Sequence, residues 1–279
     1  MSEPVFVVKA SGEREPFSDE KLRRSLQRAG APAKAIDDIS KHMRVELKDG
    51  MTTAEIYRRA FSILKHEGRH FAARYSLKRA IMGLGPTGHP FEKFVGEILK
   101  TQGYSNVQVG KIIQGICVAH EVDVVAEKDE RRIMVELKFH NTPGIRTDVK
   151  VALYVQARFE DIDKQWKHEP SHGIQIHEAW LMTNTKLTSE AIAYGKCVGM
   201  KVIGWSYPAG GSLQHLVERS GLHPVTSLTT LSRAQKVQFL DRGIIVCKDI
   251  QNNRDIIMSL GVSEAKFNQI VKEAGELCI

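Results

Sequence analysis

The chain has 279 residues, which is more than one ordinary core of about 100–200 residues needs, so its length predicts two or three domains. Lys and Arg number 40 against 33 Asp and Glu, for a net charge of +7, and 42% of the residues are hydrophobic. These values exclude a disordered, collagen-like or coiled-coil chain, and they are compatible with a polyanionic partner.

The apolar segments are short, and none approaches the roughly 18 residues that a membrane-spanning helix needs. The N-terminal residues carry neither a secretory signal nor a myristoylation motif, so we expect a cytoplasmic protein without a membrane partner. The four cysteines form no C-x-x-C pair, which argues against a zinc site or a redox motif.

Two clusters of Gly and Pro, at residues 83–90 and 207–212, predict three domains over residues 1–86, 87–208 and 209–279. Hydrophobic periodicity then predicts the elements within them. The expected order is a strand over 5–9, a helix capped by Ser18, helices near 36–43, 57–64 and 71–81, a helix over 91–99, strands near 107, 122–126 and 133–139, a helix over 148–166, a strand at 180–183, a helix over 191–198, a strand over 201–205 and helices within 226–279. The fold class is therefore α/β, with a small strand-plus-helices module, an αβββαβ core with a mixed sheet and an all-helical C-terminal segment.

The segment from Asp123 to Lys138 carries the most informative chemistry. Alternation along a strand puts Glu136 and Lys138 on one face. If residues 128–131 form the hairpin loop, counting inward puts Asp123 opposite Glu136, with Cβ atoms about 5 Å apart. Two carboxylates and an ammonium group are expected to converge.

Opposed carboxylates destabilise a sheet unless a cation lies between them, and Mg²⁺ suits such oxygen ligands. A bound divalent cation lowers the pKa of its water and neutralises charge on a phosphodiester, while Lys138 can orient that water. The sequence therefore favours phosphodiester hydrolysis. An exposed hairpin, with Glu136 and Lys138 on a solvated edge, is the alternative.

Asp123 with Glu136-Leu-Lys138, preceded by the helical segment 88–104, resembles the PD-(D/E)xK restriction-endonuclease superfamily, in particular its Mrr-like branch, over about residues 88–206. The resemblance implies a DNA substrate, Asp and Glu as ligands of Mg²⁺ or Mn²⁺, and a catalytic Lys. It implies Glu92 as a further ligand, although a first-turn Glu is also favoured by the helix dipole.

Two further polar residues, His120 and Gln156, are candidates for accessory roles at this site. His120 precedes the Asp where the family is usually richer in Gly, so we expect it to line the site differently. Gln156 lies on the later helix, where related nucleases often carry a polar site residue, but a surface Gln on an amphipathic helix fits the same pattern.

The first domain places two lysines around a tight turn and beside a helix N-terminus, where phosphates bind well. A strand-turn-helix with solvated lysines is the structural alternative. Residues 3 to about 84 resemble the ATP-cone domain that senses ATP and dATP in ribonucleotide reductases and their repressor. The resemblance implies nucleotide contacts at Lys9, Glu15, Lys21, Thr53 and Tyr57. Ala10 and Ser11 replace the Arg-Asp pair common in this family, so one phosphate contact is missing.

The tail contains Leu260-Gly-Val-Ser263 between two helical stretches, which looks like a helix-hairpin-helix that can hold a DNA phosphate. Packing or dimerisation explains the same pattern. The leading hypothesis is a metal-dependent endodeoxyribonuclease regulated by ATP or dATP, working as a homo-oligomer, with defence against foreign DNA as a fitting role. The alternative is a nucleotide-responsive DNA-binding regulator whose nuclease fold does not cleave.

Overall fold

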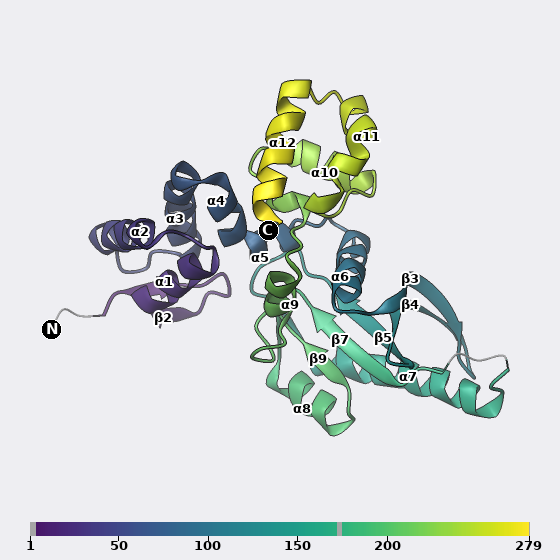
Figure 1. Ribbon diagram of the computed structural model, residues 1–279. Coiled ribbons are helices and arrows are strands. Elements are labelled where there is room, and N and C mark those ends of the chain that lie inside the picture. The colour runs from purple at the N-terminus through teal and green to yellow at the C-terminus, as the bar shows by residue number, and fades with distance from the viewer. Residues whose placement is uncertain (1–3, 172–174, 279) are drawn as a thin grey trace. The chain divides into compact units, whose positions relative to one another are not determined.

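The computed structural model describes residues 4–171 and 175–278 (Figure 1). The chain divides into two compact units, residues 1–83 together with 223–279, and residues 84–222. The outer limits of the three predicted domains, residues 1 and 279, lie outside the described residues. Within the described ranges, no helix is long and apolar enough to cross a membrane.

The N-terminal part of the first unit is the predicted strand-plus-helices module, with a second strand, over residues 14–16, that was not predicted. Its elements are β1 (Phe6–Val8), β2 (Arg14–Pro16), α1 (Asp19–Arg28), α2 (Ala33–Glu46), α3 (Thr53–Glu67), α4 (Arg69–Tyr75) and α5 (Leu77–Met82). Ser18 caps α1 by accepting from the Lys21 N–H, and Thr52 and Glu55 form a reciprocal capping box at α3. These caps satisfy N–H groups that each helix start leaves without a partner.

The single helical stretch expected over residues 71–81 is instead two short helices, so that prediction was wrong in detail. The backbone of Ser76 leaves the helical geometry, with φ −86° and ψ 3°, and its hydroxyl donates to the Ala73 carbonyl oxygen at 2.9 Å. A serine side chain that competes for a helix carbonyl favours such a break.

The C-terminal part of the first unit is helical, which confirms the prediction for the tail. It contains η1 (Val225–Ser227), α10 (Arg233–Asp241), η2 (Cys247–Asp249), η3 (Gln251–Asn253), α11 (Arg254–Ser259) and α12 (Glu264–Leu277). Gly261 adopts φ +78° between α11 and α12, and Ser263 caps α12. Helix, glycine turn and capped helix follow one another as the tail sequence indicated.

The tail contacts the N-terminal helices within this same unit. The Arg74 guanidinium of α4 donates to the Glu276 carbonyl oxygen at 2.9 Å, and His70 lies 3.2 Å from the Glu276 carboxylate. The Thr226 hydroxyl of η1 donates to the Ala80 carbonyl oxygen of α5 at 2.6 Å. The first and last segments of the chain therefore share polar contacts.

The second unit is built on a five-stranded mixed sheet in the order β3-β4-β5-β7-β9. Its elements are α6 (His89–Thr101), β3 (Ser105–Gln114), β4 (Ala119–Lys128), β5 (Arg131–Lys138), β6 (Arg146–Thr147), α7 (Val149–His168), β7 (Glu178–Thr183), β8 (Lys186–Leu187), α8 (Ser189–Cys197), β9 (Lys201–Ile203) and α9 (Leu213–Ser220). The first three strands of the sheet pair antiparallel, and β5, β7 and β9 pair parallel. The predicted αβββαβ core is confirmed.

Helices α6 and α7 cover opposite faces of this sheet. Gly96 of α6 approaches Val109, which pairs with Val124 on β4. The next residue on that strand, Val125, belongs to the apolar cluster that contains Val155 of α7. Because successive side chains on a strand point to opposite faces, the two helices flank the sheet. The strands that carry the candidate site are thus packed between two helices.

Candidate active site

A two-residue turn sets the register of the β4–β5 hairpin. Asp129 and Glu130 have φ values of +50° and +59°, as a type I′ turn requires at both central positions. The paired residues run from Lys128 opposite Arg131 to Val124 opposite Val135. Asp123 and Glu136 are the next facing positions, so the hairpin register agrees with the count made from the sequence.

The regular pairing of the two strands ends at these acidic residues. Asp123 Oδ2 accepts a hydrogen bond from the Leu137 N–H at 2.6 Å. The carboxylate thus takes the place of a backbone carbonyl as the partner of that N–H group. This hydrogen bond fixes the Asp123 side chain beside β5.

Glu136 forms an ion pair with Arg158 of α7, in which the Arg158 side chain is only 7% exposed. The same guanidinium also donates to the backbone carbonyl oxygen of Glu121 on β4. Arg158 therefore connects the helix to both strands of the hairpin.

Arg158 was not predicted from the sequence, although its position carries a signal. The residue lies three positions after Val155 and four before Ile162, both of which are buried. A charged side chain within such an apolar stripe requires a buried partner. That requirement points to an acidic residue on the sheet beneath α7.

Burial raises the pKa of both carboxyl groups, and Asp123 raises the pKa of Glu136 further. Burial raises the pKa of Asp123 to about 6. The hydrogen bond from the Leu137 N–H lowers this pKa, and the charge of Glu92 raises it. Burial and the neighbouring Asp123 raise the pKa of Glu136 to about 7, although Arg158 and Lys138 favour its charged form. Paired carboxyl groups with raised pKa values in a folded protein are typical of functional sites.

Glu92 and Lys138 lie within electrostatic range of this pair. Glu92, in the first turn of α6, repels both Asp123 and Glu136, and its carboxylate is 3.2 Å from His89. Lys138, at the exposed end of β5, attracts Glu136. Within the described ranges no hydrogen bond or ion pair holds the Lys138 ammonium group, so it is available to a ligand.

The donor set suits a hard divalent cation. Asp123 and Glu136 each use one carboxylate oxygen in a protein contact, and their other oxygens bear no hydrogen bond among the described residues. No group of three or more His, Cys, Asp or Glu side chains close enough to hold a metal occurs in the part of the chain that the structure describes. Mg²⁺ is commonly bound by one or two carboxylates, with waters and substrate phosphate completing its shell. The carboxylates of Asp123 and Glu136 are therefore enough for a Mg²⁺ site.

His120 and Gln156 are engaged elsewhere. The His120 ring lies 2.8 Å from the Asp161 carboxylate of α7. Burial raises the pKa of Asp161, but hydrogen bonds from His120 and Cys117 lower it to about 2. The Gln156 amide donates to Glu160 on the same helix at 3.0 Å. The structure brings neither side chain into contact with Asp123 or Glu136.

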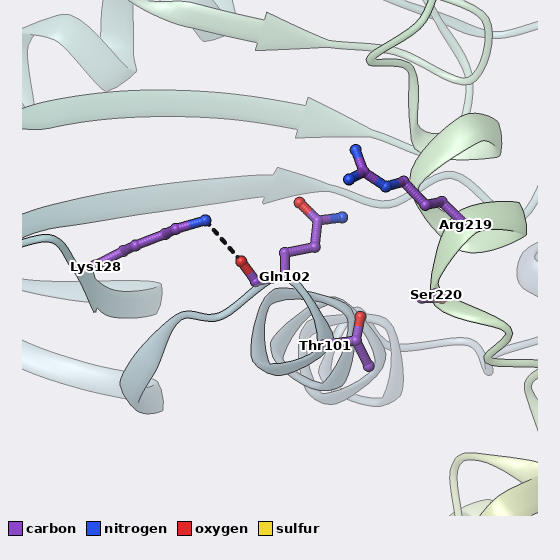
Figure 2. Close-up of a pocket in the computed structure, with 5 residues that line it drawn as sticks. All are labelled: Thr101, Gln102, Lys128, Arg219 and Ser220. Carbon is purple, nitrogen blue, oxygen red and sulfur yellow. Dashed lines mark hydrogen bonds between the residues drawn. The ribbon is translucent and has the colours of Figure 1, made fainter.

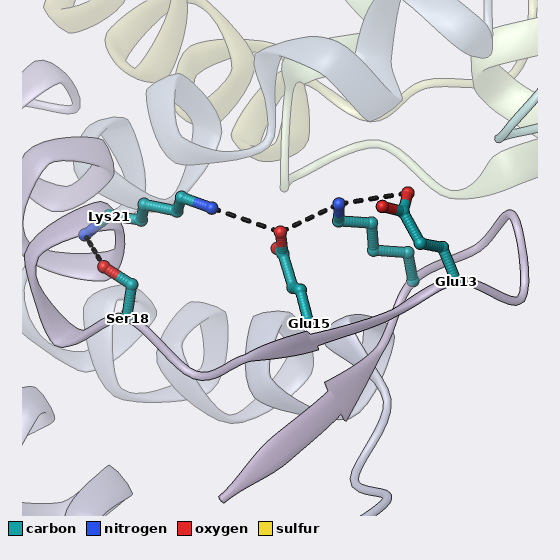
Figure 3. A network of polar contacts seen from close by, with 5 residues as sticks. Glu13, Glu15, Ser18 and Lys21 are labelled. Atoms are coloured by element: carbon teal, nitrogen blue, oxygen red, sulfur yellow. Dashed lines mark hydrogen bonds and ion pairs between the residues drawn. The ribbon is translucent and has the colours of Figure 1, made fainter. Parts of the chain in front are cut away.

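In the first unit, three of the predicted nucleotide contacts form one network. The Glu15 carboxylate lies 2.8 Å from the Lys9 ammonium and 3.2 Å from that of Lys21. Figure 3 shows Glu15 with Lys21 on one side, and Ser18 capping the helix from which Lys21 projects. The hydrogen bond with Glu15 raises the pKa of Lys9, and the contact with Lys9 lowers that of Glu15. Two ammonium groups and a capped helix N-terminus are thus gathered beside one turn.

The other two predicted contacts lie on α3. A bridge between Val8 and Thr52 brings the start of α3, where Thr53 is the first residue, beside the strand that leads to Lys9. Tyr57 lies one turn further along, stacked on Tyr75 with ring centroids 5.2 Å apart, and the Arg79 guanidinium lies 3.5 Å from its ring centroid. Within the described ranges no hydrogen bond, ion pair or ring contact joins Tyr57 to the lysine network.

Three segments of the chain match known protein families. Residues 5–82 match the ATP cone domain, residues 86–205 match the restriction endonuclease domain of the Mrr type, and residues 223–278 match the AF1548-like C-terminal domain. The fold and the acidic pair thus define a restriction-endonuclease-like protein with an ATP-cone domain, as the sequence motifs indicated.

Two relatives cover most of the chain. An uncharacterised protein of Archaeoglobus fulgidus is 36% identical over 181 residues, which are 64% of this chain and 97% of that protein. The crystal structure of a protein of unknown function, AF1548, superposes with a TM-score of 0.56 at 33% identity and covers 69% of this chain and 98% of its own. The chain belongs to the AF1548-like family.

Proposed function

We propose that this chain is a metal-dependent endonuclease that hydrolyses phosphodiester bonds of DNA and responds to ATP or dATP bound by its cone. The observation that carries the proposal is the juxtaposition of Asp123 and Glu136 where the pairing of β4 and β5 ends. Such a pair is unfavourable without a cation between its oxygens, and the match to the restriction endonuclease domain supports DNA as the substrate.

In this proposal Asp123 and Glu136 hold Mg²⁺ or Mn²⁺, and Glu92, which the sequence resemblance implied as a further ligand, adds negative charge from the first turn of α6. A bound divalent cation supplies an acidified water and neutralises charge on the phosphodiester. The Leu137 N–H keeps one oxygen of Asp123 in place, and Arg158 keeps one oxygen of Glu136 in place. The Lys138 ammonium orients the attacking water and stabilises charge that develops on the phosphate.

The cone is proposed to bind nucleotide at Lys9, Glu15, Lys21, Thr53 and Tyr57. Its occupancy is then expected to change the assembly of a homo-oligomer, and cleavage with it. Such regulation requires that the two assembly states differ in nucleotide affinity.

The proposal also includes a division into three domains with limits at residues 86 and 208, a cytoplasmic location and a role against foreign DNA.

A non-cleaving DNA-binding regulator is the second candidate, and the Arg158–Glu136 ion pair favours it. An internal guanidinium partly neutralises the acidic pair without any metal ion. In that case the nuclease fold would bind DNA without cleaving it, and Mg²⁺ would alter neither the DNA affinity nor the integrity of the DNA.

A cleavage assay on the full chain separates the two candidates. Supercoiled, linear and single-stranded DNA are incubated with Mg²⁺, Mn²⁺ or EDTA, and the products are resolved on gels. We expect metal-dependent nicking that Glu136→Gln and Lys138→Ala each reduce by at least about a hundredfold, the usual scale for a catalytic group. Lys186→Ala, at an exposed position on β8, serves as the matched control and leaves the rate unchanged. DNA binding without nicking under every condition would favour the regulator.

A further inference from the structure

The second unit contains a polar cavity apart from the acidic pair. Its volume is about 230 Å³, and it is lined by Thr101, Gln102, Lys128, Arg219 and Ser220 (Figure 2). These residues come from the end of α6, the end of β4 and the end of α9. Lys128 lies five residues from Asp123 on an extended strand, so their Cα atoms are roughly 16 Å apart.

Three side chains of the cavity, those of Gln102, Lys128 and Arg219, keep hydrogen-bond donors available. The hydroxyls of Thr101 and Ser220 already donate to carbonyl oxygens within their helices. The Gln102 Nε2 is buried and has no hydrogen-bond partner among the described residues. Lys128 uses one N–H on the Gln102 carbonyl oxygen at 2.8 Å, which leaves two, and Arg219 makes no hydrogen bond or ion pair within the described ranges.

Among the described residues, no carboxylate forms an ion pair with Lys128 or Arg219. Glu127, beside Lys128 in sequence, is bound by Arg132. Glu218, beside Arg219, accepts from Gln214 at 2.7 Å. Burial, together with the nearby charge of Lys128, lowers the pKa of Lys201, although Glu178 opposes this shift. Lys201, whose ammonium lies 3.7 Å from the Trp180 ring centroid, is thus within electrostatic range of Lys128.

We propose that this cavity binds a phosphate group. An ammonium, a guanidinium and an amide converge on it from three elements, and donors from several directions suit a tetrahedral oxyanion. A buried donor without a partner is unfavourable, and an anionic acceptor would satisfy it. The phosphate comes either from the backbone of DNA held by this unit or from a free small anion, and the DNA source rests on the proposed function.

Binding of inorganic phosphate to the full chain tests the proposal. It is measured by calorimetry in EDTA, in a Lys9→Ala/Lys21→Ala background so that the cone lysines do not contribute. We expect Lys128→Ala and Arg219→Ala each to weaken phosphate binding about tenfold, the scale of one charge-assisted hydrogen bond. Lys100→Ala, whose exposed ammonium near the cavity pairs with Glu97 at 2.7 Å, is the matched control and stays within twofold.

Binding of duplex DNA in EDTA, followed by fluorescence anisotropy over a salt series, identifies the source. A DNA phosphate in the cavity predicts a parallel loss of affinity in both variants and a salt slope reduced by about one. If both variants bind inorganic phosphate more weakly but bind DNA with unchanged affinity, the ligand of the cavity is a free anion. Lys128→Arg keeps a positively charged donor, so we expect it to retain phosphate binding. If Lys128→Ala does not fold, Arg219→Ala alone tests the proposal, because Arg219 is exposed. Inorganic phosphate affinity that is equal in wild type, Arg219→Ala and Lys100→Ala overturns the proposal, whatever the cleavage assay shows.

Discussion

Arg158 and Glu136 form an ion pair in which the two side chains are only 7% and 17% exposed, and the same guanidinium binds the backbone carbonyl of Glu121. A pair this buried stabilises a fold chiefly when both partners are present, because removal of one leaves the other desolvated. Arg158 is thus a positioning residue that holds Glu136 relative to β4.

Replacement of Arg158 tests this role. Arg158→Gln should lower the free energy of unfolding by about 3–5 kcal/mol, and it should raise the Glu136 pKa further because a favourable charge is lost. The pH at half-maximal cleavage then moves upward. Arg131→Gln is the control, because that arginine pairs with Glu178 at an exposed position and surface pairs contribute about 0–1 kcal/mol. Equal denaturation midpoints and equal pH profiles for the two variants would contradict the role assigned to Arg158.

Asp123→Asn should stabilise the metal-free protein. Burial raises the pKa of this carboxyl to about 6 from 3.8. A carboxyl group with a higher pKa in the folded chain opposes folding above its unfolded pKa, so the free energy of unfolding falls as pH rises from about 4 to about 6. Removal of the charge should add about 1–3 kcal/mol at pH 8 and nothing near pH 3. Calorimetric melting in EDTA at both pH values measures this, and a lower melting temperature for the variant at pH 8 contradicts it.

Removal of metal should lower the melting temperature of the wild type more than that of variants at Asp123 or Glu136. Binding to the folded state raises stability in proportion to the logarithm of the free ligand concentration, so Mn²⁺ should raise the melting temperature of wild type above that in EDTA. Asp123→Asn and Glu136→Gln should each lose most of this rise, because they remove one of the two charged ligands. Glu127→Gln, on the same strand as Asp123, should keep it. A rise that is equal in all four proteins would mean that the cation binds elsewhere.

Lys9 and Lys21 should determine nucleotide affinity. Both ammonium groups contact the single carboxylate of Glu15, so phosphate oxygens can bind in the same place. We expect Lys9→Ala and Lys21→Ala each to weaken ATP and dATP binding about tenfold in calorimetry, the scale of a charge-assisted hydrogen bond. Lys41→Ala, at an exposed position on α2, should bind as wild type does. Equal affinity in all variants would remove the cone network from the nucleotide site.

The contacts between α4 and the tail should carry the response to nucleotide. Arg74→Ala removes the hydrogen bond to the Glu276 carbonyl and leaves the lysine network untouched. We expect this variant to bind ATP normally while its change in mass by light scattering, or in cleavage rate, becomes smaller. Arg69→Ala, on the same helix and exposed, is the control. A full response in Arg74→Ala would show that the signal takes another route.

Much of the candidate site was predictable because it lies within one hairpin. The period of two along each strand and a short turn together determine which side chains face each other. Asp123 and Glu136 could therefore be paired from their distance to the turn at Asp129 and Glu130. The caps at Ser18 and Ser263 were predictable for a similar reason, since each cap bonds only three residues along the chain.

The partners of these residues were decided by the tertiary structure. Arg158 reaches Glu136 across 22 residues, and its direction depends on how α7 packs on the sheet. The donor-lined cavity combines residues from α6, β4 and α9, and no periodicity in the sequence relates them. Local patterns specify which face of an element is buried, whereas contacts between elements depend on the packing of the whole core. The sequence by itself determined the acidic pair and the class of fold, and only the tertiary structure decided which cations stand beside the pair and which are left to bind an anion.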